Sequence, residues 1–191
     1  MTLRLITAPT VPAVSLVSAK AHVRAVDPDE DTLITAMIGA ATQAAEHETG
    51  RAIMTQTLEA GFDTFPVSFR LTRGPVQSVT SITYTDSAGS IQTISPGLYK
   101  LVQDDFGGAQ IGPSFGNSWP VFRNEIDGIK IRFIAGYADA ASVPEGIKSW
   151  ILLHVGALYE NRASEVIERG MQIKLGFADR LLDRYRVYGT C

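Results

Sequence analysis

The chain of 191 residues is long enough for one domain with a large insertion, but not for several independent domains. Hydrophobic residues make up 45% and charged residues 19%, which excludes a disordered chain, and a net charge of −3 excludes a bulk attraction to nucleic acid or anionic lipid. The single cysteine, Cys191, excludes an intrachain disulfide and a cysteine metal cage, and no stretch is apolar enough for a membrane span.

The N-terminal residues 1–14 are expected to form an extension that precedes the fold. Pro9 and Pro12 interrupt this stretch before the apolar core of a signal peptide can form, so we expect a soluble protein made in the cytoplasm. Ser15 is a suitable N-cap for a short helix over residues 16–25.

A longer helix follows, and it is the clearest element in the sequence. Asp27 suits its N-cap, Pro28 its first turn and Gly50 its end. Apolar residues recur at helical spacing between these signals: Leu33, Ile34, Met37, Ile38, Ala41, Ala44 and Ala45.

From Thr55 onward the apolar residues alternate with polar ones, which predicts strands. Turn signals at residues 73–75 and 86–89 divide this region. The expected strands cover residues 58–62, 67–71, 79–84, 91–94, 99–102, a short piece around 111, and 129–133. Because no helix separates them, we expect an antiparallel meander or sandwich rather than a parallel sheet.

Helix returns at Pro144 and continues to about Arg162. Its apolar face needs a partner, and it consists of Ile147, Trp150, Ile151, His154, Val155, Leu158 and Tyr159. Residues 163–174 have no clear period and are expected to be a loop, and a short amphipathic helix is expected from Phe177 to Tyr185. The prediction is an α+β fold, a small helical bundle with an antiparallel β-sheet or sandwich insertion. Residues 15–54 and 144–188 form its discontinuous helical domain and residues 55–139 the insertion.

Motifs for catalysis or for metal and cofactor binding are weak, and we predict none of these sites. The stretch 112–116 matches G-x-S-x-G around Ser114, but an esterase elbow needs a strand before it and a helix after it. The acidic residues at 27, 29 and 31 match the start of a calcium-binding loop, but the glycine and the final glutamate of that loop are missing. Acidic residues are also favoured at a helix N-terminus, which is the better explanation. The three histidines lack any ligand spacing, and no phosphate-binding loop is present.

The C-terminal part carries a small basic and aromatic segment around Arg180, Arg184 and Tyr185. It could touch DNA phosphates, dock its Leu181 and Leu182 face on a protein partner, or pack on its own domain. Counted over residues 145–191, seven basic and six acidic residues make the basic patch weak, so protein docking is favoured over DNA binding.

Four stretches together resemble one family, the head–tail connector proteins (also called adaptor or head completion proteins) of long-tailed bacteriophages, prophages and gene transfer agents. The resemblance runs from about Ser15 to Arg186 and depends on the order of the stretches. They are Thr49–Thr57 (TGRAIMTQT), Arg73–Val79 (RGPVQSV), Ala135–Asp139 with Val143–Glu145 (AGYAD and VPE), and Leu158–Arg162 (LYENR).

The resemblance implies a structural virion protein, made in the bacterial host cytoplasm and assembled at the head–tail junction. Such proteins form a ring, expected to be dodecameric, between the portal protein and the stopper or tail, and the genome passes through its lumen without sequence-specific binding during ejection. The helical part would build the ring and the C-terminal segment would reach the portal. The implied interface comprises Phe177, Arg180, Leu181, Leu182, Arg184, Tyr185, Arg186 and Tyr188. No cofactor, membrane or enzymatic activity is implied.

Two alternatives remain. The β insertion could be a glycan- or receptor-binding module that uses Trp119, Tyr84 or Tyr99 as a stacking platform. An enzyme would depend on Ser114 alone, and neither alternative explains the flanking helices.

Overall fold

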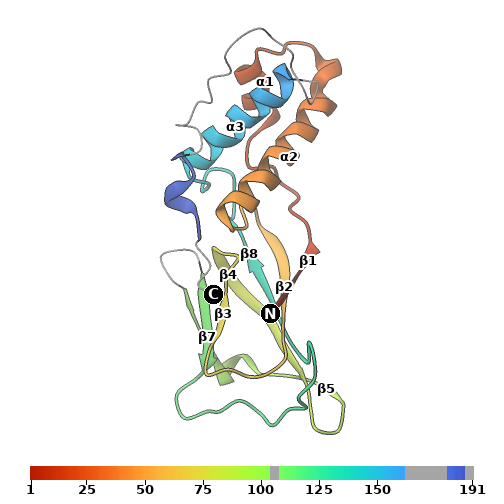
Figure 1. Ribbon diagram of the computed structural model, residues 1–191, viewed down its shortest axis with the longest axis vertical. Coiled ribbons are helices and arrows are strands. Elements are labelled where there is room, and N and C mark those ends of the chain that lie inside the picture. The colour runs from red at the N-terminus through yellow and green to blue at the C-terminus, as the bar shows by residue number, and fades with distance from the viewer. Residues whose placement is uncertain (104–107, 162–179, 188–191) are drawn as a thin grey trace. The chain divides into compact units, whose positions relative to one another are not determined.

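The computed structural model describes residues 1–103, 108–161 and 180–187 (Figure 1). The chain forms two compact units, which are treated separately below. The β unit contains the described residues of Met1–Thr10 and Thr55–Tyr137, and the helical unit contains those of Val11–Met54 and Ala138–Tyr188. Three α-helices and two antiparallel sheets make this the predicted α+β fold.

The helical unit is built from α1 (Leu16–Val23), α2 (Asp31–Thr49) and α3 (Glu145–Glu160), with short 3-10 turns η1 (Pro28–Glu30) and η3 (Asp183–Tyr185). The three helices pack against one another (Figure 1). The described core of this unit contains Ala13, Val14, Ala19, Ile34, Ile38, Ala41, Ala45, Ala52, Ile53, Met54, Val143, Ile147, Trp150, Ile151, Val155 and Leu182. Within the described residues, no helix is both long enough and apolar enough to span a membrane.

The helix boundaries follow local capping chemistry. The Ser15 hydroxyl accepts the Ser18 amide at 3.1 Å and caps α1, as predicted. Asp27 caps the 3-10 turn η1 by accepting the Asp29 amide, so the α-helix itself begins at Asp31, three residues later than Pro28. Gly50 ends α2 with a left-handed φ of 67°, a conformation that glycine adopts without strain.

The β unit contains a five-stranded sheet in the order β1-β2-β8-β4-β5 and a three-stranded sheet in the order β3-β7-β6. Every pairing is antiparallel. The strands are β1 (Thr2–Thr7), β2 (Gln56–Phe62), β3 (Phe69–Leu71), β4 (Val76–Thr85), β5 (Ile91–Thr93), β6 (Tyr99–Gln103), β7 (Ala109–Pro113) and β8 (Ile129–Ala135), with a 3-10 turn η2 (Pro96–Leu98) before β6.

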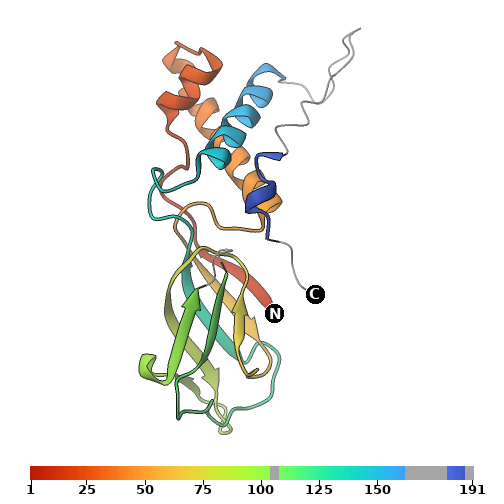
Figure 2. The ribbon, with the colours of Figure 1, turned by 90° about the vertical axis from the view of Figure 1, so that its left-hand side faces the viewer.

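The two sheets pack face to face, as Figure 2 shows for this unit. Along β8, Ile131 and Phe133 are buried while Arg132 points to the outer face, which is the alternation expected of a half-buried strand. Phe69 of the smaller sheet meets Phe62 of the larger one at a ring distance of 4.6 Å. The sandwich was therefore the correct prediction. The meander was wrong, because β8, the last strand in sequence, lies between β2 and β4.

The N-terminal extension contains a strand that the sequence analysis missed. In β1, Leu3 pairs with Ala60 of β2 and Leu5 pairs with Leu58. Arg4 lies on the outer face, and its guanidinium donates to Asp127 at 2.8 Å. Residues 2–7 alternate weakly and Pro9 follows closely, so the long-range pairing with β2, rather than a strong local pattern, makes them a strand.

Candidate functional site

The C-terminal segment 180–187, which the sequence analysis proposed as an interface, packs on the helical unit. Leu182 has no exposed surface and belongs to the core. The backbone is also tied to α2 and the residues after it, because the Val187 amide donates to the Thr49 carbonyl at 2.8 Å and Arg51 Nε donates to the Tyr185 carbonyl. The segment thus closes over the end of α2.

Only part of the predicted interface is presented outward. Arg180 and Arg184 are exposed, and Leu181 and Tyr185 are half-buried. Leu182 holds the segment in place and cannot meet a partner without leaving the core. Phe177 and Tyr188 lie outside the described residues.

Arg186 faces its own unit. Its guanidinium pairs with Glu48 at 3.0 Å and with Asp183 at 3.3 Å, and its side chain is partly covered. Arg186 therefore helps to hold the segment on α2, and Glu48 and Arg51 are the partners that sequence reasoning did not identify. A basic residue in the segment and an acid at the end of a long helix give no signal of pairing without the fold.

A glycine at the first turn of α3 allows the segment to come close. A Cβ atom on Gly146 would lie 3.1 Å from the Tyr185 ring and 3.3 Å from the Leu181 carbonyl, which is tighter than normal contact. The absence of a side chain at this position therefore sets the distance between α3 and residues 181–185.

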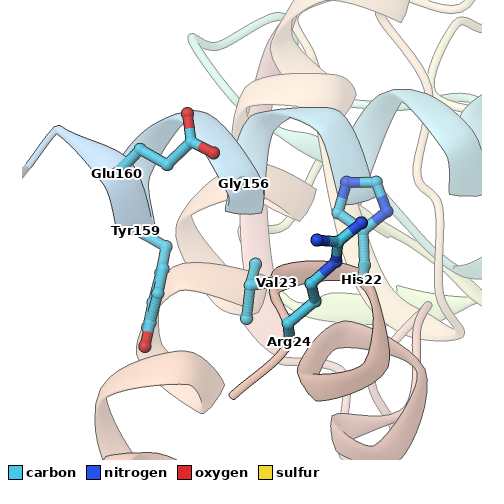
Figure 3. Close-up of a pocket in the computed structure, with 6 residues that line it drawn as sticks. All are labelled: His22, Val23, Arg24, Gly156, Tyr159 and Glu160. Carbon is cyan, nitrogen blue, oxygen red and sulfur yellow. The ribbon is translucent and has the colours of Figure 1, made fainter.

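A polar pocket of about 460 Å³ lies between α1 and the last turns of α3 (Figure 3). His22 and Arg24 stand on one side and Glu160 on the other (Figure 3). Arg24 is the C-cap of α1, with a φ of 56°, and cations are favoured at a helix C-terminus by the helix dipole. Arg24 therefore complements the end of α1, and the described lining residues do not form a set that points to a particular ligand.

The other sequence motifs take structural roles. Ser114 follows β7 and begins a turn, in which the Asn117 amide donates to the Ser114 carbonyl, and the next element is β8 rather than a helix. Asp31 pairs with Lys20, which joins α2 to α1. Among the described residues, no group of three or more His, Cys, Asp or Glu side chains could hold a metal ion.

The aromatic residues considered as a stacking platform contribute to packing. Trp119 stacks on Phe65 at 5.1 Å, and its indole N–H donates to the Pro66 carbonyl at 2.8 Å. Tyr84 meets Phe65 edge-on at 5.9 Å, and partial burial raises the pKa of the Tyr99 hydroxyl. These contacts do not favour a glycan-binding surface.

Three carboxyl groups among the described residues have lowered pKa values, and each accepts several hydrogen bonds. The side chain of Gln92 and the amide of Ser90 donate to Asp86 in the turn before β5 and lower its pKa. Partial burial opposes ionisation of Asp127, but hydrogen bonds from Arg4 and Thr2 outweigh it and lower the pKa of Asp127. The Ser142 hydroxyl and amide both donate to Asp139, which lowers the pKa of Asp139 in the turn before α3. All three groups accept hydrogen bonds that organise a turn or a strand end, which is a structural role.

No family model matches the sequence, and no curated protein is significantly similar to it. Several solved structures share its fold. They include a chain of the virion of a native gene transfer agent (GTA) particle, with a TM-score of 0.78, and a chain of the neck of an empty GTA particle computed with C6 symmetry, with a TM-score of 0.80. A chain of the neck of a native GTA particle computed with C12 symmetry has a TM-score of 0.72. Each is 22% identical, and the alignments cover 100% of this chain and 98% of the other. The likeness shows one fold shared over the whole length of both chains.

Proposed function

We propose that this protein is a structural component of the neck of a phage-like particle, the head–tail connector between the portal and the stopper or tail. The observation that carries the proposal is the shared fold with GTA neck chains, which extends over 100% of this chain and 98% of theirs. Both the helices and the β sandwich are included, so the likeness does not rest on a common helical motif. The four ordered stretches of sequence support the same assignment.

The proposed assembly is a homo-oligomeric ring, for which we expect twelve copies. The similar neck structures were computed with C6 and C12 symmetry, which supports a cyclic arrangement of this fold. Double-stranded DNA would pass through the lumen. The net charge of −3 suits that role, because a channel with many phosphate contacts would bind the DNA tightly.

Within this assembly, we assign the portal contact to the outward side of the C-terminal segment. Arg180 and Arg184 supply exposed positive charge, and Leu181 and Tyr185 supply half-buried apolar surface between them. Arginine and tyrosine are common anchors at protein interfaces. Phe177 and Tyr188 would extend the same surface, and we retain residues 15–54 with 144–188 as the connector domain and 55–139 as its insertion.

The experiment combines the purified protein with the portal of the same particle and measures the mass of the complexes by light scattering. A ring that forms on the portal is the expected result. The double variant Arg180→Glu with Arg184→Glu should lose portal binding while it retains its thermal stability. Lys100→Glu is the matched control, because Lys100 is an exposed cation in the β unit. Absence of any complex with the portal would refute the connector function, and binding by the double variant would refute only the site.

A further inference from the structure

An apolar groove lies between α2 and the end of α3, and it is called the α2–α3 groove below. It has a volume of about 440 Å³ and is lined by Leu33, Ala36, Met37, Ala40, Leu158 and Asn161. Leu33 and Leu158 are among the exposed large hydrophobic residues of the chain. Asn161 is the one polar residue of this lining, so an occupant of the groove must present apolar side chains.

The groove lies at the point where the chain leaves α3. Asn161 lines the groove, and it is the last described residue before residues 162–179, which are called the connecting segment below. The described chain resumes at Arg180. The connecting segment therefore begins at the groove itself.

The connecting segment has to reach the opposite end of the α2 and α3 pair. The Tyr159 hydroxyl donates to Glu30 at 2.8 Å, so the end of α3 lies beside the start of α2. The segment 180–187 lies against Gly146 in the first turn of α3 and donates a backbone hydrogen bond to Thr49 in the last turn of α2. In Figure 2 this segment, in dark blue, lies beside that last turn. The two helices are therefore antiparallel, and the connecting segment travels along their length.

Both ends of this path lie on one side of the helix pair. On α2, Met37 lines the groove and Glu48 binds Arg186 of the docked segment. These two positions of α2 are eleven residues apart, which is three turns and about 20°, so they share one side of the helix. On α3, Gly146 and Asn161 are only about 60° apart in projection. The connecting segment can thus follow one side of both helices without crossing either.

The connecting segment has the length and the side chains that the groove requires. Gly146 and Asn161 are about 22 Å apart along α3, whereas the 18 residues of the connecting segment reach about 60 Å when extended. The slack is enough for the chain to enter the groove on its way. Its large apolar residues are Val166, Ile167, Met171, Ile173, Leu175 and Phe177. Val166 and Ile167 are the first of these after Asn161.

We propose that the connecting segment binds in the α2–α3 groove of its own chain, with Val166 and Ile167 as the apolar side chains that fill it. The covalent link at Asn161 gives the segment a far higher effective concentration at the groove than any second copy has. Burial of apolar area on both partners drives the contact. The groove is then filled within one chain, and it is not a surface that joins copies in the proposed ring.

The first test places a charge in the groove and measures cleavage of the connecting segment by trypsin. Arg169 and Lys174 are the cleavage sites, and a bound segment resists the protease. Ala36→Glu should accelerate cleavage there at least about tenfold, because the contact would bury an unpaired carboxylate. Thr35→Glu is the matched control, since Thr35 is exposed and lies about 160° around α2 from Leu33.

Both positions accept glutamate in a helix, so each variant should keep a melting curve close to that of the wild type. Two results would overturn the proposal. One is wild-type cleavage at Arg169 and Lys174 as fast as in a free peptide of the same sequence. The other is equal acceleration by Ala36→Glu and Thr35→Glu.

The second test distinguishes the segment of the same chain from that of a second copy. Cys191→Ser removes the natural cysteine, and Ala40→Cys then carries a benzophenone maleimide at the groove. Irradiation should give a product of monomer mass in which position 40 is joined to a residue of the connecting segment. Thr35→Cys with the same label should give no such product. Crosslinks that join two chains, or none to the connecting segment, would overturn the proposal.

Both tests use the free chain without the portal. Their failure would leave the connector function untouched, and failure of portal binding would leave the contact in the groove untouched.

Discussion

The change Leu182→Ala tests whether the C-terminal segment is held on the helical unit as a separate element. Leu182 is the fully buried residue of the segment, and its neighbours on either side are exposed or half-buried. Truncation of a fully buried leucine to alanine costs about 2–5 kcal/mol, because apolar contacts are lost and a cavity remains. The other contacts of the segment are weaker. They are the half-buried side chains of Leu181 and Tyr185, and hydrogen bonds and ion pairs that contribute only about 0.5–1.5 kcal/mol each.

The lost stability should appear as local opening of the C-terminal segment rather than as unfolding of the whole helical unit. A cost of about 2 kcal/mol raises the population of the open segment about thirtyfold, since 1.4 kcal/mol corresponds to about a factor of ten. The Val187 amide reports on this opening, because it donates to the Thr49 carbonyl only while the segment is docked. Its hydrogen exchange should accelerate at least about thirtyfold, while the amides of Ile38 and Ala41 in α2 keep their rates.

Arg184→Ala is the control, because Arg184 is exposed and its truncation removes no buried surface. Two results would refute the reasoning. An unchanged exchange rate at Val187 would mean that Leu182 does not hold the segment. Equal acceleration at Val187 and at Ala41 would mean that the segment and the helices open together.

Three further predictions follow from single contacts. The pKa of Asp127 is lowered, so its bond to Arg4 stabilises β1 fully at any pH above the ordinary aspartate pKa, and this stability is lost as the pH falls through the lowered pKa. Hydrogen exchange of the β1 amides should therefore show a loss of protection in acid. Asp127→Asn should abolish this pH dependence. Gly39→Ala should raise the free energy of unfolding by about 0.5–1 kcal/mol, because nothing lies within 4 Å of the added Cβ and alanine favours a helix. Thermal unfolding measures this, and a lower melting temperature would contradict it. Glu59→Gln should lower the free energy of unfolding of the β unit by about 1–2 kcal/mol, because Glu59 is mostly buried and accepts two hydrogen bonds from Arg132. Urea unfolding measures this, and an unchanged midpoint would mean that the Glu59–Arg132 pair makes no net contribution to stability.

Local signals in the sequence predicted most of the helices and strands. The Ser15 cap, the left-handed Gly50 and the spacing of apolar residues located α1 and α2 to within a few residues. Alternation located β8, whose buried and outward residues follow the predicted pattern. These features depend on residues that are close together in the chain, so a single sequence contains the information.

Features that depend on distant residues were not predictable in the same way. The position of β8 between β2 and β4, and the pairing of β1 with β2, are set by contacts between residues 45 or more positions apart. The burial of Leu182 next to half-buried Leu181 has the same origin. The sequence shows two adjacent leucines, and only the position of the segment over the end of α2 distinguishes the core residue from the surface residue.

The proposed portal contact depends on charge, and salt tests it. The contact uses the exposed side chains of Arg180 and Arg184. Raising the ionic strength from about 0.15 M to 1 M shortens the screening length from about 8 Å to 3 Å and weakens exposed charge pairs. Portal binding should therefore weaken in high salt. Binding that is equally tight in 1 M salt would show that these charges do not hold the protein on the portal.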